Sequence, residues 1–142
     1  MAEASLITPA MQRAVGTAGE PQAATIERGA ILRFTEAIGD PNPAYPDVAP
    51  PTFLRSLPVP TASFPDADTV PRLLDGGSAW TYHTPIRPGD VITVTTVLKS
   101  LKEREGRMGA MLITEHQIEY RNQRGELAAT QHTTHIRMGA AE

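Results

Sequence analysis

The strongest constraint on the fold lies in the second half of the chain, where the sequence changes after Gly77 to the period-two alternation of β-strands. Residues 91–101, 108–120 and 127–138 are rich in β-branched side chains, which favour strands, and residues 78–84 form a shorter strand before them. Polar turns separate these strands, at residues 85–90, 102–107 and 121–125. The sequence therefore predicts a run of antiparallel strands joined by short connections.

Helix signals dominate the first half of the chain. Thr8 followed by Pro9 marks a helix start, and Gly16 marks its end. A second helix is predicted over residues 28–38, and a short third helix over residues 50–57. The apolar face of the second helix is expected to hold Ile31, Phe34 and Ile38. Residues 58–72 are rich in proline and are predicted to form an ordered loop, so the chain as a whole is of the α+β class.

Composition narrows the classes of protein. The 142 residues are enough for one domain, predicted over residues 1–142, and the net charge of −3 with no basic run argues against nucleic acid and anionic membranes. Cysteine is absent, which excludes disulfides and thiolate metal sites. The chain shows neither a signal peptide nor an apolar run long enough to span a membrane, so a cytoplasmic protein is expected.

The histidines do not form a metal-binding pattern. His132 and His135 lie three residues apart on a predicted strand, so their side chains point to opposite faces of the sheet. His116 shares its predicted face with Leu112 and Ile118, and is expected to be packed or at an interface. No metal site is predicted.

The segment after the second helix carries the most unusual chemistry. Residues 39–45 read GDPNPAY and resemble the G-D-x-N-P-x-H signature of the MaoC-like (R)-specific enoyl-thioester hydratases and dehydratases. Residues 49–53 (APPTF) and 82–90 (YHTPIRPGD) are similar to the N-terminal, FAS-type dehydratase branch of that superfamily. The resemblance extends over residues 6–138 and depends more on the order and spacing of these motifs than on any one of them.

This resemblance implies a hot-dog fold, in which an antiparallel sheet wraps a central helix and pairs with a second such unit as a homodimer or a heterodimer. It implies a substrate carried as a thioester of coenzyme A or of acyl-carrier protein, and no cofactor. In catalytic members the aspartate and histidine of the motif activate water for addition to a C2–C3 double bond. A backbone N–H at the start of the central helix holds the thioester oxygen.

The sequence departs from that pattern in three places. Asp40 and Asn42 match the motif, but Tyr45 stands at the histidine position and, with a pKa near ~10, is a poor base at neutral pH. Pro50 and Pro51 stand where the family has histidine and glycine, and proline has no N–H to donate. Only three residues, 46–48, separate Tyr45 from Ala49, where relatives carry a longer segment.

Several residues have both a structural and a functional interpretation. Asp40 and Asn42 are turn-building types, Tyr45 can be a packed aromatic, and Thr52 or Phe53 can replace the missing amide donor. His83 is the other candidate for proton transfer. Cations that can contact coenzyme A phosphates are Arg72, Arg87, Lys99 and Lys102, although solvated surface charge is the better explanation of each one taken singly. Asp75-Gly76-Gly77 precedes a strand, so it is not a phosphate-binding loop.

Three hypotheses follow. The leading one is an accessory subunit of a hydratase or dehydratase, which shapes the acyl pocket while a MaoC-like partner supplies the Asp/His pair. The second is a self-sufficient homodimeric hydratase that uses Asp40 with Tyr45 or His83. The third is a non-catalytic module that binds acyl thioesters. In each, Asn42, Pro51, Thr52, Phe53 and Arg87 are the expected substrate contacts.

Overall fold

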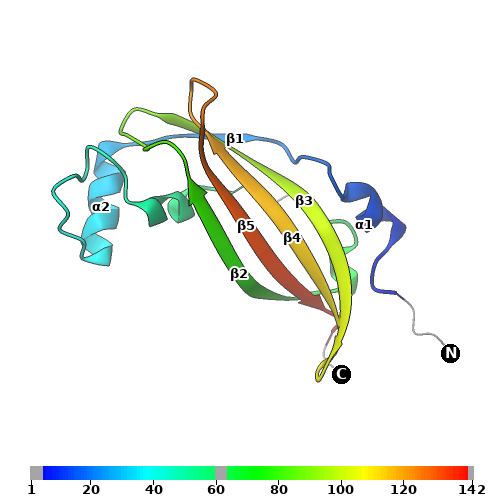
Figure 1. Cartoon of the computed structure of the whole chain (residues 1–142). Coiled ribbons are helices and arrows are strands. Elements are labelled where there is room, and N and C mark those ends of the chain that lie inside the picture. Colours follow the sequence, from blue (N-terminus) through cyan, green and yellow to red (C-terminus); the bar gives the residue numbers. More distant parts are fainter. Residues whose placement is uncertain (1–4, 60–63, 141–142) are drawn as a thin grey trace.

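The computed structural model describes residues 5–59 and 64–140, and its main feature is one five-stranded antiparallel sheet (Figure 1). The strands lie in the order β1-β3-β4-β5-β2. Their bounds are β1 (Gln22–Thr25), β2 (Arg72–Tyr82), β3 (Val91–Gly106), β4 (Gly109–Arg121) and β5 (Leu127–Met138). The three central strands are consecutive in the chain, since short hairpins join β3 to β4 and β4 to β5. The predicted α+β class is confirmed.

Within the described residues, two α-helices and two short 3₁₀ helices accompany the sheet. They are α1 (Pro9–Ala14), α2 (Arg28–Ile38), η1 (Pro51–Ser56) and η2 (Ala67–Thr69). In α1 the Thr8 hydroxyl caps the helix by accepting from the Met11 N–H at 3.2 Å, and α2 ends at Gly39, whose φ of 68° is left-handed. Figure 1 shows α2 and η1 together on one side of the sheet, with α1 on the other side of the view. The three helices predicted from sequence are all present.

The strand boundaries differ from the prediction at several places. β2 begins at Arg72 rather than at residue 78, and β3 continues to Gly106 through residues that were predicted to be a charged turn. The charged residues of 102–106 stay in a strand because β4 pairs with them at an exposed end of the sheet. β1 was not predicted: it is four residues long and its place is set by pairing with β3. Residues 60–63 of the predicted loop lie outside the described residues.

The apolar core is divided into two clusters. The larger one gathers residues of α2, η1 and the neighbouring ends of β3, β4 and β5, including Ile31, Phe53, Ile92, Ile118 and Tyr120. The smaller one contains Met11, Val70 and Leu112. The predicted inward face of β4 is confirmed, because Leu112, Thr114, His116 and Ile118 are all buried. Ile38 was wrongly expected in the core: its side chain is 48% exposed, and α2 buries Ile31 and Thr35 instead.

Candidate functional site

The loop after α2 is built by its own polar side chains. The Asn42 N–H donates to Asp40 Oδ1 at 3.1 Å, and the Ala44 N–H donates to Asn42 Oδ1 at 3.0 Å. Each side chain therefore closes a turn two residues ahead of itself, as aspartate and asparagine commonly do. An ion pair of 2.8 Å between Arg28 and Asp47 ties the far end of the loop back to the start of α2.

Tyr45 lies against both of these side chains. Desolvation, and then the negative charge of Asp40 and a hydrogen bond to it, raises the pKa of the Tyr45 hydroxyl, while Asn42 acts weakly in the opposite direction. The phenol therefore keeps its proton at neutral pH and acts as a hydrogen-bond donor. The loop brings Asp40, Asn42 and Tyr45 together, but no base stands at the position of the family's histidine.

The backbone positions at the start of η1 differ in whether they have an N–H that is free to donate. Pro51 has no N–H, and the Phe53 N–H is already bonded to the Pro50 carbonyl at 3.0 Å. Within the described part of the chain, nothing accepts a hydrogen bond from the Thr52 N–H, and Thr52 itself is exposed. Phe53 is buried and meets Phe34 edge to face, with ring centroids 5.6 Å apart. Thr52 therefore offers the free amide of this turn, and Phe53 serves the core.

A pocket of about 310 Å³ opens beside η1. Carbon-rich side chains form much of its wall, among them Val48, Pro51, Leu54 and Ile86. Tyr82 lines it as well and donates its hydroxyl to the Pro51 carbonyl at 3.2 Å. His83 is exposed and also borders this pocket, whereas Asp40, Asn42 and Tyr45 are not among the lining residues. The two groups of expected site residues therefore occupy different places around η1.

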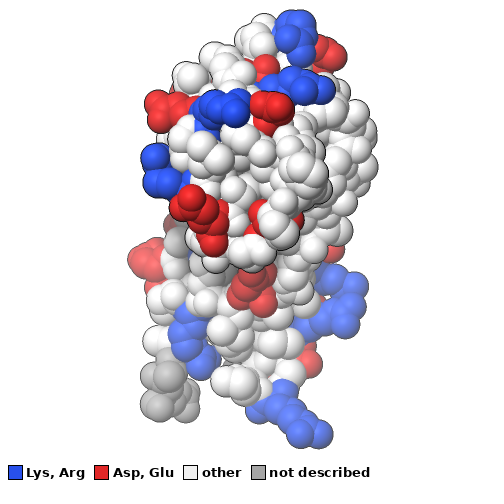
Figure 2. Space-filling model, turned by 90° about the vertical axis from the view of Figure 1, so that its left-hand side faces the viewer, with Lys and Arg blue, Asp and Glu red and all other residues white. Residues whose placement is uncertain are grey.

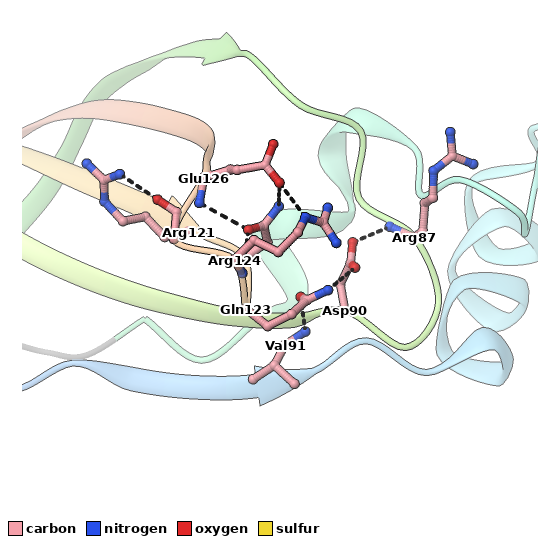
Figure 3. Close-up of polar contacts among 9 residues, drawn as sticks. Arg87, Asp90, Val91, Arg121, Gln123, Arg124 and Glu126 are labelled. Carbon is pink, nitrogen blue, oxygen red and sulfur yellow. Dashed lines mark hydrogen bonds and ion pairs between the residues drawn. The ribbon is translucent and has the colours of Figure 1, made fainter.

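Arg87 and Asp90 have structural partners in the turn before β3 (Figure 3). Asp90 is only 7% exposed; its carboxylate accepts from the Arg87 backbone N–H at 2.9 Å and from the Gln123 side chain at 3.0 Å. Gln123 in turn accepts from the Val91 N–H at 3.0 Å, which ties this turn to the β4–β5 hairpin. The Arg87 guanidinium points away from Asp90, as Figure 3 shows. Sequence reasoning missed Asp90, although a Pro-Gly-Asp turn before a β-branched run is a signal for such an anchor.

Charge is evenly mixed on the face that carries α2. Figure 2 shows Lys and Arg interspersed there with Asp and Glu, without a continuous basic patch. Of the cations expected near coenzyme A, Arg72 donates to the Gly139 carbonyl at 2.6 Å, and Lys99 and Lys102 are exposed. No group of three or more histidines and carboxylates among residues 5–59 and 64–140 is arranged to hold a metal ion. No helix of the same residues is long and apolar enough to cross a membrane.

Comparison with known proteins places this arrangement in a family. The sequence model described as "FAS1-like, dehydratase domain region" matches residues 13–131. The chain belongs to this dehydratase-domain family. Two curated relatives are both named UPF0336 protein. The one from Streptomyces avermitilis is 33% identical over 98 residues, 57% of this chain and 65% of that protein. The one from Streptomyces griseus is 30% identical over 134 residues, 82% of this chain and 87% of that protein.

Solved structures share the fold of this dehydratase-family chain. The ChsH1-ChsH2 complex from Mycobacterium tuberculosis matches with a TM-score of 0.75 and 18% identity, over 93% of both chains. A MaoC-like dehydratase matches with a TM-score of 0.76 and 20% identity, over 92% of this chain and 44% of that one. The HadBC (3R)-hydroxyacyl-ACP dehydratase complex from M. tuberculosis matches with a TM-score of 0.65 and 20% identity, over 87% and 96%. The expected MaoC-like resemblance and the hot-dog fold are confirmed.

Proposed function

We propose that the chain is an accessory subunit of an (R)-specific enoyl- or 3-hydroxyacyl-thioester hydratase/dehydratase. The observation that carries this proposal is that Tyr45, a phenol that is protonated at neutral pH, lies beside Asp40 where the family has its histidine. Hydration needs a group that can accept a proton from water, and no such group stands beside Asp40. In the proposed complex a MaoC-like partner supplies the Asp/His pair, while this chain shapes the acyl pocket.

An exposed edge strand supports pairing with a second hot-dog subunit. β2 is the last strand of the sheet, with β5 as its neighbour. Its Leu73 and Leu74 side chains are each 50% exposed, and an unpaired apolar edge of this length is a template for another strand. The names of two similar structures, the ChsH1-ChsH2 and HadBC complexes, describe assemblies of this kind.

The acyl thioester is proposed to bind at the pocket beside η1. Its carbon-rich wall suits an acyl group. Thr52 does not line this pocket but follows the lining residue Pro51, and its free N–H is proposed to bind the thioester oxygen at the pocket edge. This free amide is also the observation that favours the second candidate, a self-sufficient hydratase. In that candidate Asp40 acts with Tyr45 as the proton donor, or His83 does so at the pocket edge.

The test compares the purified chain alone with the chain mixed with a MaoC-like protein that carries an intact G-D-x-N-P-x-H motif. Hydration of crotonyl-CoA and longer enoyl-CoA is followed in both samples, with Asp40→Asn in this chain as the matched variant. The accessory role predicts turnover that requires the partner and survives Asp40→Asn. Robust turnover by this chain alone, lost in Asp40→Asn while the fold is kept, establishes the second candidate instead. Saturable acyl-CoA binding with no turnover in either sample leaves the non-catalytic module.

A further inference from the structure

A polar stretch interrupts the core on the inward face of the sheet. Leu112 belongs to the smaller apolar cluster and Ile118 to the larger one, and the two inward-facing residues between them are Thr114 and His116. On the neighbouring strand β5, Thr133 pairs with His116 and His135 pairs with Thr114. A sheet face that packs on a helix is normally apolar. Here several of the inward-facing side chains are polar and border a pocket.

These side chains line a second pocket, of about 270 Å³. Its polar lining consists of Arg55, Thr96, His116, Gln131, Thr133, His135 and Arg137, and Val59, Leu73 and Ile118 complete the wall. It lies across η1 from the first pocket, since Leu54 lines one and the adjacent Arg55 lines the other. At about 30 Å³ per water molecule the volume fits a small organic group or the end of a longer one.

Part of the polar lining is satisfied internally. The Tyr120 hydroxyl donates to Gln131 Oε1 at 3.1 Å, and Gln131 Nε2 donates to the Ser78 hydroxyl at 3.0 Å. The Ser78 hydroxyl then donates to Thr133 Oγ1 at 3.1 Å. This chain fixes one wall of the pocket.

Four buried polar atoms in and next to the pocket lack partners within the described part of the chain. Thr114 Oγ1, His116 Nδ1, His135 Nδ1 and Arg137 Nε are buried, and none of them has a hydrogen-bond partner among the described residues. His116 is 8% exposed, and its ring lies 5.2 Å from that of His135. Buried polar atoms are nearly always paired, so the unpaired atoms of the three lining residues His116, His135 and Arg137 mark groups that a ligand in this pocket can pair with.

The excess of positive charge in the pocket indicates that its ligand carries a negative charge. Arg55 and Arg137 contribute two guanidinium groups, no lining residue is acidic, and neither arginine has an ion pair within the described chain. Arg137 stacks on Phe64 at 4.3 Å, which holds its guanidinium in place. Asp75 lies opposite His135 in the sheet and is a carboxylate whose charge acts on that histidine. The Asp75 Oδ1 already accepts a hydrogen bond from the Gly77 N–H. The missing partner is therefore an anion.

We propose that this pocket binds the carboxylate of a small organic acid or acyl group, with Arg137 and Arg55 as the charged partners and His116 and His135 as hydrogen-bonding groups. Guanidinium groups match the planar carboxylate. Val59, Leu73 and Ile118 favour a ligand whose carboxylate is attached to a short carbon chain, which inorganic phosphate lacks. The site is independent of the proposed function, because it requires neither turnover nor a partner.

The experiment measures binding of sodium hexanoate to the full chain by NMR of the histidine rings and by calorimetry. Hexanamide has the same size without the charge, and inorganic phosphate has the charge without the carbon chain. We expect hexanoate to saturate, to shift the His116 and His135 resonances, and to bind about tenfold or more tightly than either control, since a charged hydrogen bond contributes ~1.5–3 kcal/mol. Equal binding of hexanoate and hexanamide, or unshifted histidine resonances, overturns the proposal.

Variants locate the site. Arg137→Met is expected to weaken hexanoate binding by about tenfold or more, whereas the matched control Arg104→Met, at an exposed end of β3, leaves it unchanged. Arg55→Met, at an exposed position of η1, is the second variant if Arg137→Met does not fold. Undiminished binding in a folded Arg137→Met or Arg55→Met protein contradicts the assignment. An acyl-CoA whose chain ends in a carboxylate is compared with free hexanoate, and tighter binding of the thioester identifies an acyl group as the source.

Discussion

The buried imidazole of His116 makes stability depend on pH in a way that one substitution removes. Burial, and then the neighbouring His135 and Arg137, lowers the pKa of His116 from 6.5 to about 4. A histidine with a depressed pKa contributes its full stability above pH ~6.5, because the unfolded chain binds the proton more readily. As the pH falls from 6.5 toward 4, that contribution is lost. The loss from this one group reaches about 2 kcal/mol at pH 5 and about 3 kcal/mol at pH 4, at ~1.4 kcal/mol per pKa unit.

The assay is urea unfolding of the native chain and of His116→Gln between pH 8 and pH 4. Glutamine keeps a polar group of similar size at this position but does not titrate, so the free energy of unfolding of the variant is expected to fall less steeply below pH 6.5. His132→Gln is the matched control for the histidine-to-glutamine change, because His132 lies at an exposed position of the neighbouring strand. Parallel curves for the native chain and His116→Gln between pH 7 and pH 4 refute the reasoning.

Three further predictions concern the turns and the proposed site. Asp90→Ala removes a buried carboxylate and the part-buried hydrogen bonds that it accepts from the Arg87 N–H and the Gln123 amide, so urea unfolding is expected to show a loss of about 1–2 kcal/mol, and less in Asp90→Asn. A loss below about 0.5 kcal/mol contradicts the anchoring role. Thr8→Ala removes the cap of α1 and is expected to cost about 1 kcal/mol in the same measurement, with Thr8→Ser close to native; equal losses in both variants argue against the capping bond. Tyr45→Phe is expected to change the rate of partner-dependent hydration by no more than roughly twofold. Loss of that hydration activity in the variant would assign Tyr45 a catalytic role.

Much of the fold could be predicted because its signals are local. The β5 strand has the predicted bounds, since alternation and a turn at each end are contained in its own sequence. The helix α2 also has the predicted bounds, because Gly39, in a left-handed conformation, ends it. β1 could not be predicted, because its four residues are held by pairing with β3 and not by burial of their own. Ile38 was misplaced for a related reason: helical spacing gives a face, but the partner of that face decides how far along the helix it is buried.

The candidate site also has one part that the sequence could predict and one part that it could not. Asp40, Asn42 and Tyr45 meet because they are within one turn-forming segment, so the sequence was sufficient to group them. That the Thr52 amide is free while the Phe53 amide is bonded depends on the 3₁₀ geometry of η1, which the sequence did not specify.

By itself the sequence determined the α+β class, the order of the helices α1, α2 and η1 and of the four longer strands, and the absence of an imidazole at position 45. These depend on residue type and on spacing over a few neighbours. Only the tertiary structure brought Arg55 of η1, His116 of β4, and His135 and Arg137 of β5 to one pocket. The pairing of β4 with β5 and the position of η1 bring together residues far apart in the chain, and burial in that place lowers the pKa of His116. No sequence pattern predicts that these distant residues share a pocket, because the register of strands far apart in the chain is fixed by the packing of the whole sheet.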